Sequence, residues 1–277
     1  MNLSTQRILV TGATGGIGRE IARQLGAEGA ALLLTGRSPV ALARLGDELR
    51  DSGVRVATVA ADLATADGRQ AVVTAAMRFR RGISGLINNA GINRFGSFAE
   101  MSGDAIRSVF EINVLAPILL THDLLPVLKR SPESVVLNVG SIVGSIGMPG
   151  QVAYSSSKFA IHGFSEALRR ETQGSGVHVL HVAPRATDTA MNDETMRAIN
   201  AVTGVNTDRP AEVARHVVAA LVAHRQERYL GWPEKFYVRV NALLPGLVDR
   251  SLKKQADLVG QSTAAGAGLT TMNGVKP

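Results

Sequence analysis

A serine, a tyrosine and a lysine lie close together in the stretch from Ser141 to Lys158, SIVGSIGMPGQVAYSSSK. Tyr154 and Lys158 are four residues apart, so on a helix they share a face, with Cβ atoms about 5–6 Å apart. An ammonium about 4 Å from a phenol stabilises the phenolate by at most about 4 kcal/mol, or roughly three pK units. The spacing predicts a general acid–base tyrosine, with Ser141 binding a substrate oxygen, although it also occurs by chance on exposed helices.

A glycine-rich loop follows the first apolar strand of the chain. Residues 12–18 read GATGGIG, between a strand at 7–11 and a helix at 19–28. Glycines at such a place allow a tight turn and let the backbone approach a pyrophosphate at the helix N-terminus. The spacing T-G-x-x-x-G-x-G differs from the common G-x-G-x-x-G, but the flanking strand and helix favour a dinucleotide site.

The end of the second predicted strand indicates which dinucleotide binds. A carboxylate there bonds the ribose 2′-hydroxyl of NAD, whereas a guanidinium holds the 2′-phosphate of NADP in a fork of donors. The sequence has Thr35-Gly36-Arg37 and no carboxylate. Arg37 therefore favours NADP(H) over NAD(H); the alternative is an ordinary exposed arginine before a turn.

Strands that alternate with helices must position these residues. Strands are predicted at 7–11, 31–35, 54–60, 85–89, 134–139, 177–183 and 228–231, and helices at 19–28, 39–52, 67–80, 102–129, from the Tyr154 region to 172, and at 209–226. This alternation predicts right-handed βαβ units. The expected fold class is α/β, a doubly wound, Rossmann-type parallel sheet of about seven strands. We expect the 102–129 helix to bend at Pro117, which lacks a backbone donor.

Together the motifs resemble the short-chain dehydrogenase/reductase (SDR) superfamily, in its single-domain branch. The matching positions are Thr11–Gly18, Asp62, Asn88–Gly91, Asn113, Ser141, Tyr154 and Lys158. The resemblance implies that Tyr154 is the proton donor and acceptor, and that Lys158 lowers its pKa and binds the nicotinamide ribose. It implies that Ser141 orients the substrate oxygen and that Asn113 holds a water in a proton relay.

The resemblance also implies a cofactor site. Asp62 and Leu63 are expected to border the adenine, and Asn88, Ala90 and Gly91 the adenosine ribose. The full expected set is Gly12, Thr14, Gly15, Gly16, Ile17, Gly18, Arg37, Asp62, Leu63, Asn88, Ala90, Gly91, Tyr154, Lys158, Pro184, Thr187 and Thr189.

One position departs from the family's pattern. Where such proteins usually have Pro-Gly and then a threonine, this chain has the sequence PRATDT from Pro184 to Thr189. Arg185, in place of the glycine, has three open roles. It contacts a cofactor phosphate, pairs with Asp188, or selects a substrate with an acidic group.

Residues 1–232 are expected to form one catalytic domain. Its segment at about 188–208 is interpreted as a lid over the site, the alternative being a plain surface excursion. Residues 233–255 form an apolar and basic C-terminal extension. Its core, 233–254, has three interpretations: a flap over a substrate channel, a subunit contact, or a membrane-surface anchor, the first two being favoured. Residues 256–277 are predicted to be a flexible tail.

Composition narrows the function classes. The 277 residues carry a net charge of +7 that is spread along the chain, and 4% are aromatic, which favours a solvated surface over a nucleic-acid interface. With no cysteine and no visible signal peptide, we expect a cytoplasmic protein. His162, His178 and His181 keep no ligand spacing with a carboxylate or cysteine, so we expect structural histidines and no metal site.

The substrate is expected to be largely apolar. The loop after Ser141 offers Ile142, Val143, Ile146, Met148 and Val152, which Phe95, Met191 and Met196 would extend. The predicted function is NADP(H)-dependent interconversion of a ketone or aldehyde and an alcohol, as a carbonyl reductase. A 3-oxoacyl-thioester reductase is the alternative enzyme, and an inactive cofactor-sensing protein is the alternative of another class. The resemblance implies a homodimer or homotetramer.

Overall fold

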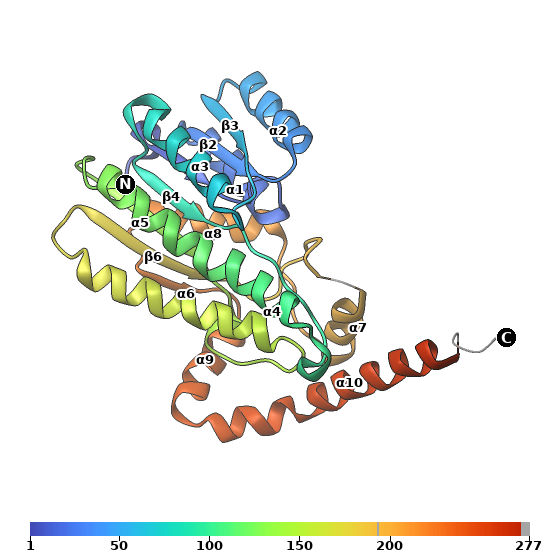
Figure 1. The fold of residues 1–277 in the computed structure, drawn as a ribbon. Coiled ribbons are helices and arrows are strands. Elements are labelled where there is room, and N and C mark those ends of the chain that lie inside the picture. Colours follow the sequence, from blue (N-terminus) through green and yellow to red (C-terminus); the bar gives the residue numbers. More distant parts are fainter. Residues whose placement is uncertain (193, 273–277) are drawn as a thin grey trace.

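A seven-stranded parallel sheet forms the centre of the structure, a computed structural model that describes residues 1–192 and 194–272, with side chains to residue 260 (Figure 1). The strands are β1 (Arg7–Val10), β2 (Ala31–Gly36), β3 (Val56–Ala60), β4 (Gly85–Asn88), β5 (Ser134–Val139), β6 (Val177–Ala183) and β7 (Glu227–Tyr229). Their order in the sheet is β3-β2-β1-β4-β5-β6-β7. The order reverses between β1 and β4, and open α/β sheets bind ligands beyond the carboxyl ends of strands at such a point.

Helices cover both faces of the sheet (Figure 1). They are α1 (Gly16–Ala27), α2 (Pro39–Asp51), α3 (Ala66–Arg78), α4 (Gly103–Phe110), α5 (Ala116–Leu128), α6 (Val152–Glu171), α7 (Glu194–Thr203), α8 (Pro210–Val222), α9 (Glu234–Leu243) and α10 (Pro245–Met272). One core layer joins the sheet to α1, α2 and α8 through residues such as Ile21, Leu42 and Val217. The other joins it to α3, α5 and α6. The predicted α/β fold is therefore confirmed.

Polar residues start several of these helices. Ser38 accepts a hydrogen bond from Ala41 N at 3.2 Å, and Thr65 accepts one from Gly68 N at 3.0 Å. Such caps satisfy amides that have no partner within the helix. Pro39 follows Ser38 in the first turn of α2, where its missing amide costs no hydrogen bond.

The predicted 102–129 helix is divided in two. A π-helical segment, Glu111–Leu115, separates α4 from α5, so the irregularity lies just before Pro117 rather than at it. Pro117 has no N–H to donate to the carbonyl of Asn113, four residues earlier, and the backbone adjusts there. Residues 103–128 are long and apolar enough to cross a membrane, since they contain an 18-residue stretch with a mean hydropathy of 1.4. Leu120, Leu124 and Leu128 are buried core residues of α5, which accounts for this composition.

The C-terminal extension forms two helices, α9 and α10, which are divided at Leu244, just before Pro245. Val238 of α9 and Val248 of α10 are buried against Ile142 and Ile146, in the loop after β5. Helix α10 is far longer than expected and projects past the body of the molecule (Figure 1). It runs to Met272, through most of the predicted flexible tail, so the backbone there differs from the prediction. Residues 273–277 lie outside the described residues.

Candidate active site

The residues expected at the site follow the carboxyl ends of successive strands. Gly12 follows β1, Arg37 follows β2, Asp62 lies just beyond β3, Gly91 lies beyond β4 and Ser141 lies beyond β5. Because all seven strands are parallel, these ends meet at the same edge of the sheet. Residues spread over nearly half of the sequence are thereby brought to one edge.

Tyr154 and Lys158 stand one turn apart near the start of α6. The Lys158 Nζ atom lies 5.6 Å from the centre of the Tyr154 ring and donates a hydrogen bond to the Val139 carbonyl at 3.0 Å. Ser141 begins a 3-10 turn, Ile142–Gly144, and its Oγ accepts a bond from Val143 N at 3.3 Å. The three predicted catalytic residues therefore come together where β5 ends and α6 begins.

Burial, and not the lysine charge, dominates the acidity of the tyrosine. It raises the pKa of Tyr154 to about 12, while a hydrogen bond with the Ser141 hydroxyl acts in the opposite direction. Burial also lowers the pKa of Lys158 to about 8. In this geometry the Lys158 ammonium donates to the Val139 carbonyl and both groups are buried, so burial outweighs any effect of the lysine charge on the pKa of Tyr154, and the expected lowering by Lys158 stays a prediction.

Asn113 is buried in the π-helical segment and its side chain is fully used. Its Nδ2 donates to the Ile92 carbonyl at 2.9 Å and to Ser157 Oγ at 3.0 Å, and its Oδ1 accepts from Ile92 N at 2.9 Å. The side chain fixes the loop that carries Gly91 against α6. A water held by Asn113, as the resemblance implies, would therefore bind its backbone carbonyl, to which Pro117 cannot donate.

The glycine-rich loop is closed too tightly for side chains. Gly12 has a φ of +62°, and a Cβ there would lie 2.8 Å from Ala90 Cα. A Cβ on Gly18 would lie 2.2 Å from the Gly12 carbonyl oxygen, and one on Gly16 would lie 3.0 Å from Thr189 Cγ2. The exposed backbone of this loop, at the N-terminus of α1, fits the pyrophosphate of a dinucleotide.

Sequence reasoning missed the residues that hold this loop in place. Thr11 Oγ1 accepts hydrogen bonds from the amides of Asn89 and Ala90, both at 3.0 Å. The Nδ2 of Asn89 donates to the carbonyls of Thr11 and Gly12, at 3.0 and 3.2 Å. Both residues belong to the motifs that carried the resemblance, and their place in those motifs was the signal in the sequence that could have identified them.

Asn88 requires a correction. It was expected beside the adenosine ribose, but its side chain is buried and donates to Asn138 Oδ1 at 2.8 Å and Thr121 Oγ1 at 3.2 Å. Asn138 in turn donates to Ser165 Oγ at 2.8 Å. Asn88 is the last residue of β4, and its side chain therefore joins β4 to β5 and α5 instead of facing a ligand.

Two of the residues expected around the adenosine end, Arg37 and Asp62, are open to solvent. Arg37 is exposed and makes no ion pair or hydrogen bond with the described residues. Thr14 lies next to Gly36, since a Cβ on Gly36 would be 3.1 Å from Thr14 Oγ1. Asp62 is exposed and accepts a bond from Ala64 N at 3.0 Å, whereas Leu63 is buried. The guanidinium of Arg37 is thus available to an anionic ligand.

Arg185 has a structural role that none of the three interpretations described. Its guanidinium bonds Asp208 Oδ1 at 2.7 and 2.9 Å, Glu234 Oε2 at 3.2 Å and the Trp232 carbonyl at 3.1 Å. The suggested ion pair of Arg185 with Asp188 is wrong. The chain returns to the end of β6 at Asp208, and the carboxylate of Asp208 takes that place. The pairs raise the pKa of Arg185, through Asp208 above all.

The 188–208 segment lies over the cofactor residues. Its base is closed by backbone hydrogen bonds from Asp188 N to Asp208 O and from Asp208 N to Ala186 O. Thr189 contacts the glycine-rich loop, and Met191 Cε would lie 3.9 Å from a Cβ on Gly91. These contacts favour the lid over the plain surface excursion.

The apolar loop after β5, expected to line the substrate pocket, also packs against the C-terminal helices. Ile142 and Ile146 are buried against Val238 and Val248, so they form the base on which α9 and α10 rest. Phe95 lies against Gly150, close to α10. The extension therefore borders the candidate substrate region, which supports its interpretation as a flap.

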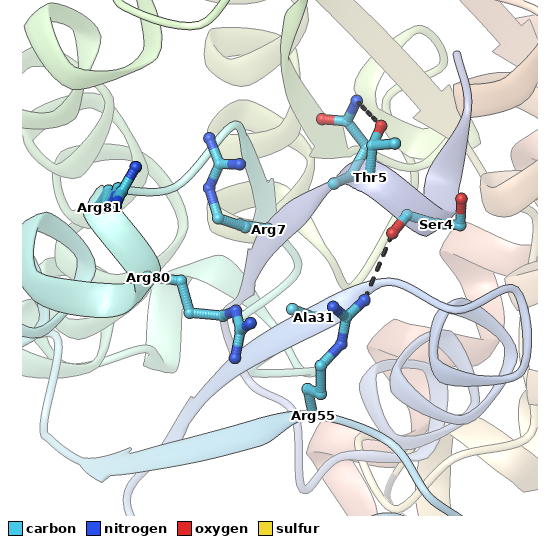
Figure 2. Close-up of a pocket in the computed structure, with 8 residues that line it drawn as sticks. Ser4, Thr5, Arg7, Ala31, Arg55, Arg80 and Arg81 are labelled. Atoms are coloured by element: carbon cyan, nitrogen blue, oxygen red, sulfur yellow. Dashed lines mark hydrogen bonds between the residues drawn. The ribbon is translucent and has the colours of Figure 1, made fainter.

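A cavity of about 480 Å³ lies at the other edge of the sheet (Figure 2). It is lined by residues at the amino ends of strands, including Arg7, Arg55, Arg80 and Arg81. These four arginines carry part of the net positive charge, but they are far in the fold from Ser141 and Tyr154. The cavity is therefore distinct from the candidate active site.

Comparison with known proteins identifies the family of the chain. The model of the short chain dehydrogenase family matches residues 6–200. Dehydrogenase/reductase SDR family member 7B of Bos taurus is 33% identical over 262 residues, which are 90% of this chain and 81% of that protein. Ketoacyl reductase HetN of Nostoc sp. is 33% identical over 220 residues, or 79% of this chain and 76% of the relative.

Two solved structures share the fold. A short chain dehydrogenase/reductase from Burkholderia phymatum, in complex with NAD, has a TM-score of 0.81 at 23% identity and covers 89% of this chain and 96% of its own. A short-chain dehydrogenase from Sphingobium yanoikuyae, in complex with NADPH, has a TM-score of 0.75 at 26% identity, with 88% and 95% covered.

Proposed function

The chain belongs to the short-chain dehydrogenase family, and we propose that within this family it is an NADP(H)-dependent carbonyl reductase. In this proposal it interconverts a ketone or aldehyde with the corresponding alcohol on a largely apolar substrate. The observation that carries the proposal is the meeting of Ser141, Tyr154 and Lys158 beside Gly91, at the edge where the glycine-rich loop lies. A nicotinamide cofactor bound there supplies the hydride.

The proposed proton chemistry belongs to the protein. The high pKa of Tyr154 keeps its phenol protonated at neutral pH, so it can give a proton to the oxygen of a carbonyl that accepts hydride. Ser141 donates a hydrogen bond to the same oxygen and orients it. The buried ammonium of Lys158, one turn away, stabilises the phenolate that remains.

NADP(H) is proposed over NAD(H) because of Arg37. An exposed guanidinium without a partner among the described residues, at the end of β2, suits a 2′-phosphate. The relative from Sphingobium yanoikuyae holds NADPH, which agrees with the proposal, although the fold neighbour from Burkholderia phymatum holds NAD. The two cofactors must therefore be compared directly.

The test is a rate measurement with purified protein. NADPH oxidation is followed at neutral pH with a panel of apolar ketones and aldehydes, and repeated with NADH. We expect turnover of at least one substrate, with a higher kcat/KM for NADPH. NADPH binding without turnover on any substrate would instead support a cofactor-sensing protein, and equal efficiency with NADH would remove the assignment of Arg37.

A 3-oxoacyl-thioester reductase is the second candidate. It is favoured by the similarity to Ketoacyl reductase HetN of Nostoc sp.. An acetoacetyl thioester in the same panel distinguishes the two proposals. Faster turnover of the thioester than of every simple ketone would favour this second candidate.

We also propose a homo-oligomer. Leu115, just before α5, Leu119 on α5 and Phe159 on α6 are 45%, 38% and 44% exposed. Exposed apolar side chains on neighbouring helices are typical of a subunit interface. The extension 233–254 is proposed as a flap or subunit contact, since Trp232, Phe236 and Leu243 are also exposed beside its buried face; binding to a membrane surface is the less favoured interpretation.

A further inference from the structure

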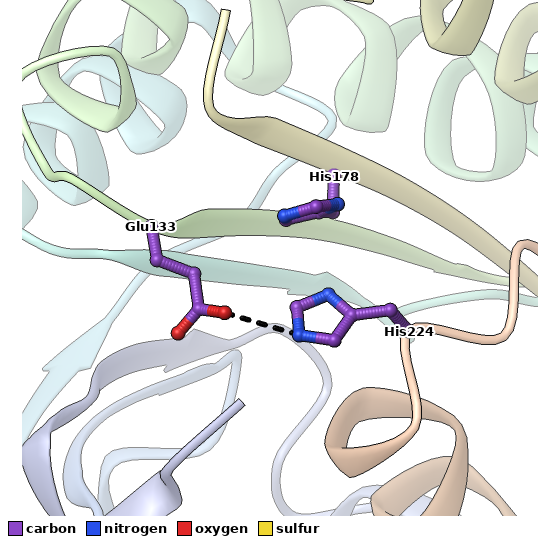
Figure 3. Close-up of side chains that lie close together, drawn as sticks. All are labelled: Glu133, His178 and His224. Carbon is purple, nitrogen blue, oxygen red and sulfur yellow. Dashed lines mark ion pairs between the residues drawn. The ribbon is translucent and has the colours of Figure 1, made fainter. Parts of the chain in front are cut away.

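Two histidines and a glutamate meet at the edge of the sheet opposite the active site (Figure 3). Glu133 lies just before β5, His178 is the second residue of β6, and His224 lies between α8 and β7. One nitrogen of each histidine and one carboxylate oxygen all lie within 4.8 Å of one another. Each residue comes from a different part of the chain, so only folding brings them together.

The backbone aims these three side chains at one point. Strands β5 and β6 pair with Val135 opposite His178, which places Glu133 near the same strand end. His224 has a φ of +49°, a conformation that is uncommon outside glycine, and it turns the chain back from α8 toward the sheet. Figure 3 shows the carboxylate of Glu133 and the ring of His224 facing each other below His178.

The distances are close to those of a metal site. His224 Nε2 lies 3.1 Å from Glu133 Oε1, and the rings of His178 and His224 are 4.2 Å apart at 60°. Zinc binds imidazole and carboxylate ligands at about 2.0–2.2 Å in tetrahedral geometry, so two ligand atoms are roughly 3.4 Å apart. Since His178 is exposed, its ring has room to turn toward the other two groups.

We propose that Glu133, His178 and His224 form a binding site for a divalent transition-metal ion of the zinc type. The donor set is two imidazoles and one carboxylate, which leaves a fourth position for water. The ring of His224 is partly buried beside the carboxylate of Glu133. Its Nδ1 is buried and has no hydrogen bond among the described residues.

The amino group of Met1 lies next to the proposed metal site. It lies 2.9 Å from His224 Nε2 and donates to the Val222 carbonyl at 2.9 Å. Its positive charge opposes a cation at the same nitrogen, whereas the carboxylate of Glu133 favours one. Metal binding therefore displaces the contact between Met1 and His224.

A second group of candidate ligands is less suited. His162, His181 and Glu227 are also close together, but the two rings are stacked at 4.9 Å with only 16° between their planes. Ring nitrogens bind metals in the plane of the ring, so nearly parallel stacked rings do not direct them to one point. Gly140 packs on the ring of His181 and restricts its rotation.

Metal at the proposed site would act as a structural link. It would connect the starts of β5 and β6 to the turn before β7, at the far end of the sheet from Tyr154. Anything that binds only the folded state stabilises it, so the melting temperature should rise with metal. The site is independent of the proposed reductase activity.

The test uses zinc ion alone, titrated into the full chain by calorimetry in a buffer that does not bind metal. We compare the wild type with Glu133→Gln and His178→Ala, and with His122→Ala and His162→Ala as controls. His122 is an exposed histidine outside the cluster, and His162 belongs to the second group. Melting curves without zinc check that each variant folds; Glu133→Gln keeps the size of the side chain.

We expect one zinc ion per chain in the wild type, with affinity reduced at least tenfold in Glu133→Gln and His178→Ala and unchanged in the two controls. Zinc should raise the melting temperature of the wild type and of both controls only. The proposal is overturned by an absence of saturable binding, or by wild-type affinity in His178→Ala. It is equally overturned if the loss occurs in His162→Ala, since the stacked cluster would then hold the metal.

Discussion

Burial has opposite effects on the two ionisable side chains of the active site. It makes the phenol of Tyr154 a weaker acid and the ammonium of Lys158 a stronger one, because both charged forms lose contact with water. A protonated tyrosine is the form that carbonyl reduction requires. At the residue scale, the site is thus prepared for proton donation more than for proton removal.

Removal of the Tyr154 hydroxyl tests this acid role directly. In Tyr154→Phe we expect kcat to fall by about 10² to 10⁴, the range that general acid catalysis contributes. The affinity for NADPH, measured by fluorescence titration, should change by less than about threefold, since the glycine-rich loop and Arg37 are untouched. A variant that kept most of its turnover would exclude Tyr154 as the acid.

Lys158 should make stability depend on pH. Below pH 8 it is protonated in both the folded and unfolded chain, and burial of the ammonium costs about 3 kcal/mol, from a pKa shift of 10.5 to about 8. As the pH rises from about 8 to 10.5, the folded protein releases this proton first, so the Lys158-dependent free energy of unfolding increases.

Lys158→Met lacks this titration. At pH 7 the variant lacks the buried ammonium and should therefore have a higher free energy of unfolding than the wild type. We expect this difference, measured by urea unfolding, to decrease by about 3 kcal/mol between pH 7 and pH 10.5. Tyr154 is present in both proteins, so its own titration cancels from the comparison. Exposed Lys129→Met is the control, and a difference for Lys158→Met that stayed constant with pH would contradict the prediction.

Arg37 should decide between the two nicotinamide cofactors. Hydrogen bonds to a charged group contribute about 1.5–3 kcal/mol, so in Arg37→Ala we expect kcat/KM for NADPH to fall roughly 10- to 100-fold. The value for NADH should stay within about twofold. Arg44→Ala, a nearby exposed arginine on α2, is the matched control; an equal loss with both cofactors would show that Arg37 does not read the 2′-phosphate.

At the element scale, Arg185 joins three segments of the chain. It ties the end of β6 to the closing residue of the lid, Asp208, and to the first residue of α9, Glu234. These side chains are 15–20% exposed, so their charges are partly shielded from water. Arg185, which stands where the family usually has a glycine, therefore holds together the elements around the site through ion pairs.

Arg185→Met should remove these ion pairs. It leaves Asp208 and Glu234 without their cation, and we expect the free energy of unfolding to fall by about 2–3 kcal/mol. Limited proteolysis should cut first within residues 188–208. Arg250→Met, at an exposed position on α10, provides the comparison; equal stability of the two variants would show that the ion pairs contribute nothing.

For the whole molecule, the exposed apolar residues of α5 and α6 predict association between copies. A glutamate at position 119 would place a charge within the proposed interface. In Leu119→Glu we expect the mass measured by light scattering to fall from that of a dimer or tetramer to a smaller species. Val202→Glu, at an exposed apolar position on the lid, serves as the control; a monomeric wild type would end the proposal.

Much of the fold follows from local patterns. Every strand of the sheet was predicted within about two residues, because apolar runs between turn residues are local signals. A bend of the long helix at Pro117 was expected, but the π-helical segment just before it was not, since the sequence does not show how the backbone adjusts to the missing N–H of Pro117. The length of α10 was also missed, because its small residues resemble a flexible tail.

The sequence by itself determined the family, the parallel sheet and the gathering of Ser141, Tyr154, Lys158 and the glycine-rich loop, since motif order and strand direction suffice for these. Only the tertiary structure decided the pKa values of Tyr154 and Lys158, the partners of Arg185 and the inward position of Asn88. It alone brought Glu133 to His178 and His224. Burial, and contacts between residues distant in the chain, depend on how the elements pack, and no local pattern records them.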